Sequence, residues 1–271
     1  MNLQLHKPEK FNIGMQFFTK NFRGYTRIFI GILCLDLFLS TSAVAAPEEI
    51  QVYLDEFENP GQYGLDLHSN YVVAGQPATD KQLRLTPEFS YGLNNNWEVG
   101  AYVLTAAAPG GAVATDGIKF RAKWRPRPAS IDTPFYWAVN FEAGQLSKRF
   151  YPDELSSELK LIGVWKNNYW TVGTNLNFDR SLKSNPIQAT STEFDTKIAY
   201  QVRNGLQIGV ENYSFLGAMH NDPSQPQSNQ ANYLVADLML GKWDLNVGLG
   251  HVSGPSPDGT VIKAIIGFPL D

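Results

Sequence analysis

A column of basic side chains recurs at every second position of one short segment: Lys119, Arg121, Lys123 and Arg125. The positions between them are apolar, so a β-strand would place the charges on one face and the apolar groups on the other. Glu98 and Glu142 fall in the segments before and after, where adjacent strands would present them to the basic column. Two chemistries remain open: ion pairs that fill and stiffen a protein interior, or a charged constriction that attracts and orders anions.

Other residue types that could bind a metal or a phosphate are scattered. His68 and His220 are far apart in sequence and have no partner cluster at metal-ligand spacing, so we expect no metal site and no cofactor. Gly110 and Gly111 lack the strand-to-helix context of a phosphate-binding loop.

The segments that must position these groups are β-strands, because apolar and polar residues alternate with a period of two between clusters of turn residues. Twelve strands are predicted, near 62–74, 82–93, 96–107, 116–126, 134–144, 155–165, 169–179, 192–202, 205–216, 231–241, 242–252 and 259–269. Their number is even, and at about ten residues they are longer than the usual five or six.

The connections between these strands alternate in length. All six tryptophans lie beside the short turns, whereas the other strand ends are joined by longer polar loops. Amphipathic rings belong at a membrane–water boundary. A soluble sandwich also alternates, but these features together favour an all-β, antiparallel transmembrane β-barrel of the outer membrane, with short periplasmic turns and longer external loops.

The polar face of every strand in such a barrel points into the lumen. The charged residues that we expect to line it are Arg84, Glu88, Glu98, Lys119, Arg121, Lys123, Arg125, Glu142, Lys160 and Lys197. Barrels of eight strands are filled by side chains and those of sixteen hold open water, so about twelve strands predict a narrow or partly plugged pore.

The N-terminal region has the pattern of a secretory signal peptide. Basic residues precede an apolar run from Ile28 to Leu39, and small residues follow up to Ala45, after which we expect cleavage. The run is too short for a membrane anchor and contains Asp36. These features predict a signal peptide at residues 1–45 and export in a Gram-negative cell.

Cleavage would leave an acidic N-terminal segment, 46–61, that is either periplasmic or inserted in the lumen, followed by the barrel at 62–271. Residues 1–45 hold five of the 22 Lys and Arg and two of the 26 Asp and Glu, so the other 226 residues carry a net charge of −7. This balance excludes a nucleic-acid surface. Cys34 is the only cysteine, so the mature chain has no disulfide. The expected partners are outer-membrane lipid and lipopolysaccharide, the barrel-assembly machinery and a small-molecule solute.

Two stretches carry a resemblance to a known family. Residues 64–71 (GLDLHSNY) and the hairpin Leu85 to Gly100 (LTPEFSYGLNNNWEVG) resemble the outer-membrane β-barrels of the MetA-pathway of phenol degradation type. The resemblance implies a transporter-like conduit for small solutes, including aromatic and other organic compounds, and it contributes no catalytic residues. Barrel chains commonly end in an aromatic residue, a role that Phe268 would take here.

His251 and Ser253 are the one pair with a catalytic interpretation. They share the lipid-side face of a strand, and outer-membrane phospholipase A and the lipid A deacylases have a similar His-x-Ser pair. The orienting Asn or acid that those enzymes place about a dozen residues further on is missing near Ile265. We therefore expect a non-enzymatic channel for passive passage of small solutes. The alternatives are a non-conducting structural barrel and a lipid hydrolase using these two residues.

Overall fold

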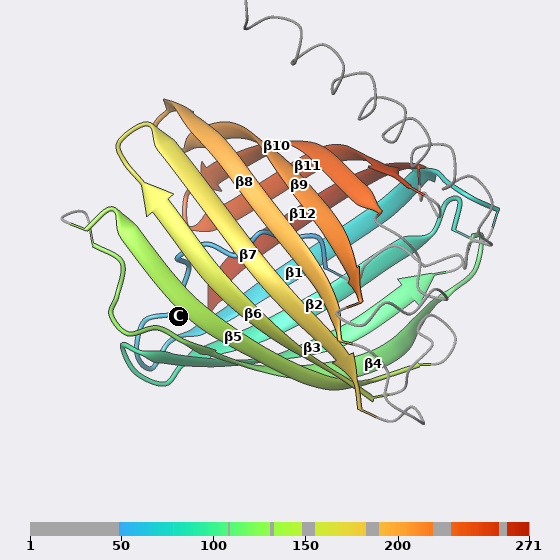
Figure 1. Ribbon diagram of the computed structural model, residues 1–271, viewed down its shortest axis with the longest axis horizontal. Coiled ribbons are helices and arrows are strands. Elements are labelled where there is room, and N and C mark those ends of the chain that lie inside the picture. The colour runs from blue at the N-terminus through green and yellow to red at the C-terminus, as the bar shows by residue number, and fades with distance from the viewer. Residues whose placement is uncertain are drawn as a thin grey trace, which may run out of the picture. The chain divides into compact units, whose positions relative to one another are not determined.

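The computed structural model describes residues 49–77, 79–107, 109–130, 133–147, 155–182, 190–218, 229–254 and 259–270. Twelve antiparallel strands in this part of the chain form one closed barrel, in which each strand pairs with its sequence neighbours and β1 pairs with β12 (Figure 1). The strands are β1 Tyr63–Ala74, β2 Leu83–Gly92, β3 Trp97–Ala107, β4 Val113–Trp124, β5 Phe135–Leu146, β6 Leu155–Lys166, β7 Trp170–Ser181, β8 Ser191–Arg203, β9 Leu206–Ala218, β10 Gln230–Leu240, β11 Trp243–Ser253 and β12 Gly259–Leu270.

The predicted fold class and number of strands are thus confirmed. The largest difference is in β4, which begins at Val113 rather than at residue 116, because the ladder with β3 continues past an irregularity between Leu104 and Thr105. The predicted signal peptide lies outside the described residues. No helix among the described residues is long and apolar enough to span a membrane.

The two faces of the barrel wall differ in polarity as the alternation predicts. Phe120 is 65% exposed on the outer face, whereas its neighbour Arg121 is 6% exposed on the inner face. The same contrast holds around the barrel, where exposed large side chains are apolar and the buried ones on the inner face include most of the charges. An apolar outer band suits hydrocarbon, and closure of the twelve described strands into one sheet leaves none of them as an open edge, as a membrane requires.

Aromatic rings gather at the short-turn end of the barrel. The ring centroids of Trp97 and Trp124 are 6.4 Å apart, and those of Trp124 and Trp137 are 5.5 Å apart. Trp243 packs edge-on against Phe268 with centroids 5.1 Å apart. These contacts form the aromatic girdle that the sequence predicts, and Phe268 contributes to it.

The described residues before β1 enter the interior of the barrel. Ile50, Val52, Tyr53 and Leu54 are buried there, and the chain reaches the wall at Gly61, whose backbone N–H donates to the Gly92 carbonyl over 2.7 Å. We call residues 49–60 the lumen segment. Of the two locations considered for the acidic N-terminal region, the described part occupies the lumen.

Candidate functional site in the barrel lumen

The wall holds the lumen segment chiefly by its backbone. The amide of Asn175 on β7 accepts from the Tyr53 backbone N–H over 2.7 Å and donates to the Tyr53 carbonyl over 2.9 Å. Lys263 on β12 donates to the Ile50 carbonyl over 2.9 Å, and Lys123 on β4 donates to the Glu56 carbonyl over 2.7 Å. These contacts satisfy main-chain groups of the segment. The lumen therefore binds the segment through groups that any extended chain carries.

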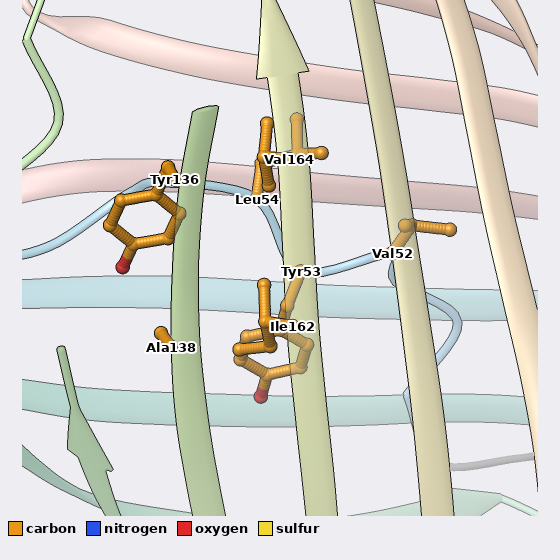
Figure 2. Packing of buried hydrophobic residues seen from close by; sticks show 7 residues of the cluster. All are labelled: Val52, Tyr53, Leu54, Tyr136, Ala138, Ile162 and Val164. Carbon is orange, nitrogen blue, oxygen red and sulfur yellow. The ribbon is translucent and has the colours of Figure 1, made fainter. Parts of the chain in front are cut away.

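Apolar packing fixes the segment from a second side. Figure 2 shows Val52, Tyr53 and Leu54 against an inward-facing patch of β5 and β6 that consists of Tyr136, Ala138, Ile162 and Val164. Ile50 belongs to a separate cluster with Val72, Tyr233, Val235 and Val261, from β1, β10 and β12. The segment thus packs against two separate parts of the barrel wall.

One glycine of the wall makes room for this packing. A Cβ atom added at Gly173 on β7 would lie 2.3 Å from Cδ2 of Leu54, a distance that real contacts do not show. Absence of a side chain at this inward position therefore allows Leu54 to seat against the wall.

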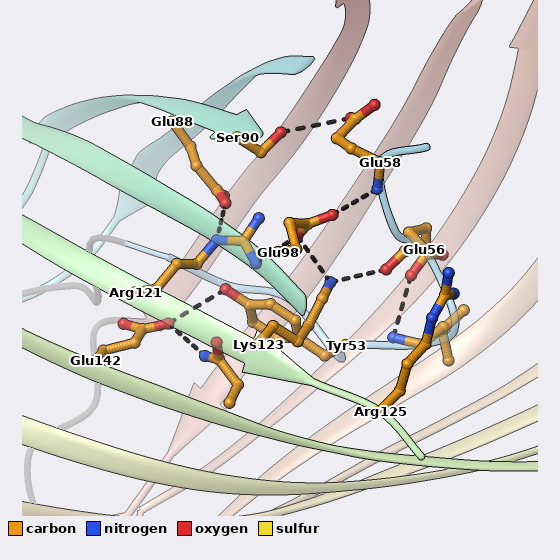
Figure 3. A network of polar contacts seen from close by, with 12 residues as sticks. Tyr53, Glu56, Glu58, Glu88, Ser90, Glu98, Arg121, Lys123, Arg125 and Glu142 are labelled. Atoms are coloured by element: carbon orange, nitrogen blue, oxygen red, sulfur yellow. Dashed lines mark hydrogen bonds and ion pairs between the residues drawn. The ribbon is translucent and has the colours of Figure 1, made fainter. Parts of the chain in front are cut away.

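Three members of the predicted basic column form ion pairs, namely Lys119, Arg121 and Lys123, and Figure 3 shows Arg121 and Lys123 among their acidic partners. Arg121 contacts Glu88 through Nε, and its Nη1 lies 2.8 Å from Oε1 of Glu98. Lys123 Nζ is 3.4 Å from the same Glu98 oxygen, and Lys119 Nζ is 3.7 Å from Glu142. These contacts favour the interpretation that the column stiffens the interior over the interpretation that it presents unpaired charge to anions.

A second ion-pair network lies on the opposite strands. Lys197 on β8 is 3.1 Å from Glu211 and 2.8 Å from Asp237, and Lys263 contacts Glu211. Asn246 donates to the same Asp237 oxygen over 2.6 Å. The lumen therefore contains charged groups on both sides of the segment.

All of the predicted lumen residues lie on the inner face. Arg84, Glu88, Glu98, Arg121, Lys123, Arg125, Glu142, Lys160 and Lys197 are buried, and the side chain of Lys119 is 11% exposed. They do not form one cluster. Lys160 lies 3.1 Å from Glu158 rather than in the basic column, and Arg125 donates to the Asn95 carbonyl of a short turn over 2.8 Å.

Several of these cations also contact aromatic rings of the lumen segment. The guanidinium of Arg125 lies 3.9 Å from the centroid of the Phe57 ring, and Lys160 Nζ lies 4.2 Å from that of Tyr53. The Tyr53 hydroxyl is 2.6 Å from that of Tyr102 on β3. Cation–π contacts of this kind stabilise desolvated rings and charges together. Single-sequence reasoning missed these residues of the segment as site residues.

A cavity of about 400 Å³ remains between the lumen segment and the wall. It extends to Gly205 and Met239 at the short-turn end, and its lining includes eight acidic and four basic side chains. Acidic groups outnumber basic ones in this lining, and they still do so when Glu58 is protonated, so the lining attracts cations rather than anions.

Glu58 connects the segment to this charged lining. Its backbone N–H donates to Glu98, and its carboxylate accepts from the Ser90 hydroxyl over 3.4 Å. Burial raises the pKa of the Glu58 carboxyl, and the nearby Glu98 raises it further against the opposing effects of Ser90, Lys123 and Arg121. We call the state in which the lumen segment packs inside the barrel the seated state. In this state the protonated form of Glu58 is favoured.

The His251 and Ser253 pair lies on the outer face of β11. His251 is exposed, and the Ser253 hydroxyl donates to the Gln230 carbonyl over 3.3 Å. Asn232 on β10 stands directly opposite His251 in the strand register, and its Oδ1 accepts from Asn212 over 2.9 Å. An asparagine therefore neighbours His251 on the preceding strand rather than on the following one.

Comparison with solved structures finds similar barrels. The COG4313 outer membrane channel from Pseudomonas putida F1 aligns with a TM-score of 0.56 and 10% identity over 82% of this chain and 100% of that chain. The KdgM porin aligns with a TM-score of 0.54 and 13% identity over 77% of this chain and 99% of that chain. The NanC porin aligns with a TM-score of 0.51 and 10% identity over 76% of this chain and 99% of that chain. No family model matches the chain, and no curated protein sequence matches it.

The closed sheet, the apolar outer band with its aromatic girdle and the charged interior define the class: a 12-stranded outer-membrane β-barrel with the fold of outer-membrane channels. At these identities the likeness concerns the fold alone. Membership of the MetA-pathway family, which the two sequence stretches predict, stays a hypothesis.

Proposed function

We propose that the protein is an outer-membrane channel for the passive passage of small solutes, and that the lumen segment is its constriction. The observation that carries this proposal is the cavity of about 400 Å³, which lies beside the segment and opens toward the short-turn end. Charged groups alone would also suit a filled interior stiffened by ion pairs, so the proposal stands on the open volume beside them, which a path for polar solutes needs.

The solute class follows from the lining. Eight acidic side chains against four basic ones favour cations or solutes with a cationic group. The rings of Tyr53 and Phe57 add flat apolar surface beside the charges, and the resemblance to the MetA-pathway family also favours aromatic and other organic compounds. We therefore propose small organic solutes that combine an aromatic body with a positive charge.

Planar-bilayer recording of the mature protein tests this function. We expect small, discrete conductance steps, and reversal potentials under a salt gradient that show preference for cations. Liposome swelling with a small aromatic amine should be faster than with an aromatic carboxylate of similar size. Equal rates for the two solutes would overturn the charge preference.

The competing non-conducting barrel makes a different prediction. It requires that neither the wild type nor a variant with a displaced lumen segment conducts, although both are folded and inserted. Asn175→Leu, which removes the main-chain contacts to Tyr53, provides such a variant. Silence of both proteins in the bilayer would favour the structural barrel.

A lipid hydrolase is the second candidate, because Asn232 stands opposite His251 and Ser253 lies two residues further along the same strand. These are the residue types of a serine nucleophile, a base and an orienting amide. Esterase activity on a short-chain phospholipid that is lost in both Ser253→Ala and His251→Gln would support it. Activity that persists in Ser253→Ala would exclude it.

A further inference from the structure

Three potential metal ligands converge inside the barrel from separate parts of the chain. Glu49 begins the described lumen segment, His68 lies on β1 and Glu88 lies on β2. One ligand atom from each lies within 4.8 Å of the others. Nε2 of His68 is 3.2 Å from Oε2 of Glu88.

His68 and Glu88 are buried, Glu49 is half-buried, and the hydrogen-bonding capacity of the cluster is incompletely satisfied. His68 is 1% exposed, and its Nδ1 has no hydrogen-bond partner among the described residues. Oε1 of Glu49 is likewise inaccessible and has no such partner in the described part of the chain. A buried polar atom without a partner costs about 1–3 kcal/mol, and more when charged, so Oε1 of Glu49 is placed to accept a further partner. The ligand atom of His68 in this cluster is Nε2, which faces Glu88.

The geometry suits a tetrahedral divalent ion. Zinc ligands lie at about 2.0–2.1 Å from the metal, which places two tetrahedral ligand atoms about 3.3 Å apart. The 3.2 Å separation of His68 and Glu88 matches this value without movement. Glu49 lies on an extended segment rather than in the sheet, so a small shift of its side chain brings the third ligand into range.

Neighbouring charges fit the same interpretation. Arg121 holds the other oxygen of Glu88, so this carboxylate is oriented while Oε2 stays directed at His68. Outer-shell partners of this kind fix the direction of a ligand. Two carboxylates match the charge of a divalent ion, and the imidazole would bind it in its neutral form, as metal-ligating histidines do.

We propose that Glu49, His68 and Glu88 form a binding site for a divalent transition metal such as Zn²⁺, with a fourth position open to water. The metal joins the lumen segment to β1 and β2, and it therefore closes the constriction more firmly. The binding site stands on the geometry of the three residues, whereas its effect on passage rests on the proposed channel function.

Isothermal titration of ZnCl₂ into the metal-stripped mature barrel in detergent tests the site. We expect one zinc per chain, and an affinity that falls at least roughly 10-fold in Glu49→Gln, because even outer-shell partners contribute 10- to 100-fold. His68→Gln should lose the site as well. Glu58→Gln is the matched control, since it removes a carboxylate of the same segment outside the cluster.

A second measurement uses Co²⁺, whose visible absorption is intense in tetrahedral coordination. The band should appear in the wild type and in Glu58→Gln, and it should be absent in Glu49→Gln. Retention of folded barrel is checked in each variant by its heat-dependent migration on denaturing gels. Wild-type protein that binds no zinc, or zinc binding that Glu49→Gln leaves unchanged, overturns the proposal.

Passage is measured separately so that the two proposals fail independently. Zinc should lower the open fraction of the wild-type channel in bilayers and leave Glu49→Gln unaffected. A protein that binds zinc through these residues but never conducts would remove the channel function and keep the metal site. Conductance without zinc binding would do the reverse.

Discussion

Replacement of one side chain of the wall, the amide of Asn175, should release the lumen segment from its position inside the barrel. Asn175 is fully buried, and its side chain satisfies both the N–H and the carbonyl of Tyr53. In Asn175→Leu the side chain keeps a similar volume but can form neither bond. Two buried main-chain groups then lose their partners, at a cost of about 1–3 kcal/mol each. The seated state is thereby destabilised by about 2–6 kcal/mol relative to the released state, in which water solvates the segment.

Even the lower bound of that range strongly changes the populations of the seated and released states. About 2 kcal/mol corresponds to roughly a 30-fold increase in the ratio of released to seated segment, since 1.4 kcal/mol is tenfold. Cys34 is the only cysteine in the sequence and lies within the predicted signal peptide, so protein produced from residue 46 onward contains none. Val52→Cys therefore supplies a single thiol that is buried only while the segment is seated.

The assay is the rate of modification of that thiol by a water-soluble maleimide, which follows the released fraction when opening is fast relative to labelling. We expect an increase of at least about 30-fold in Asn175→Leu. Asn177→Leu is the control, because Asn177 is also buried on β7 but donates to Asp195 over 2.7 Å and not to the segment. Equal rates in the two leucine variants, or no acceleration in Asn175→Leu, would refute the reasoning.

Three further predictions concern the wall, the segment and pH. Phe120→Arg places a charge on the lipid face at a cost of about 2–4 kcal/mol, and Arg121→Ala removes the buried cation that Glu88 and Glu98 share at a cost of about 3–5 kcal/mol, so urea titration should show comparable losses of stability; a far milder effect of Arg121→Ala would contradict the observed ion pairs. Gly173→Ala overpacks the segment at about 1–3 kcal/mol and should accelerate the thiol labelling, unlike Gly163→Ala on β6, whose added Cβ meets only a threonine hydroxyl at 3.2 Å; equal labelling would contradict the contact. Because the Glu58 pKa is raised in the seated state, seating is strongest below the usual carboxyl value of 4.5 and weakens as pH rises through the raised pKa; the ratio of wild-type to Glu58→Gln labelling rates should increase over that window, and a flat ratio would exclude Glu58 as the titrating group.

Comparable losses in Phe120→Arg and Arg121→Ala differ from what the sequence alone suggests. Alternation assigns Arg121 to the lumen, where a charge costs little if water surrounds it. The structure instead places it between Glu88 and Glu98 with 6% of its surface exposed. Alternation of polar and apolar residues along a strand predicts which face of the barrel wall a residue lies on. It does not predict which residues its side chain contacts.

The barrel itself could be predicted because its determinants are local. Alternating polarity, the turn residues and the position of the tryptophans each span about ten residues, and together they located all twelve strands. The location of the lumen segment could not be decided in this way, since Asn175 lies 122 residues from Tyr53. One signal was present: Tyr136, Ala138, Ile162 and Val164 are apolar on the face that should be polar, which indicates an apolar partner inside.

The candidate sites likewise could not be predicted from local sequence patterns. Glu49, His68 and Glu88 are separated by about twenty residues each, which matches no metal-binding spacing, and only the pairing of β1 with β2 and the return of the segment bring them together. The His-x-Ser pattern predicts the orienting residue of His251 on the following strand, whereas Asn232 lies opposite His251 on the preceding one. In an antiparallel barrel each strand has two neighbours, and either of them can supply a partner.

The position of Ile50 bears on how the barrel is assembled. Its side chain clusters with Val72 of the first strand and Val261 of the last, and its carbonyl accepts from Lys263, 213 residues further along the chain. The first and last strands can pair only after the whole chain has been delivered to the membrane. Contacts of such long sequence separation form late. We therefore expect closure of the sheet to be coupled to filling of the lumen, because the start of the chain packs against both strands of the seam from within.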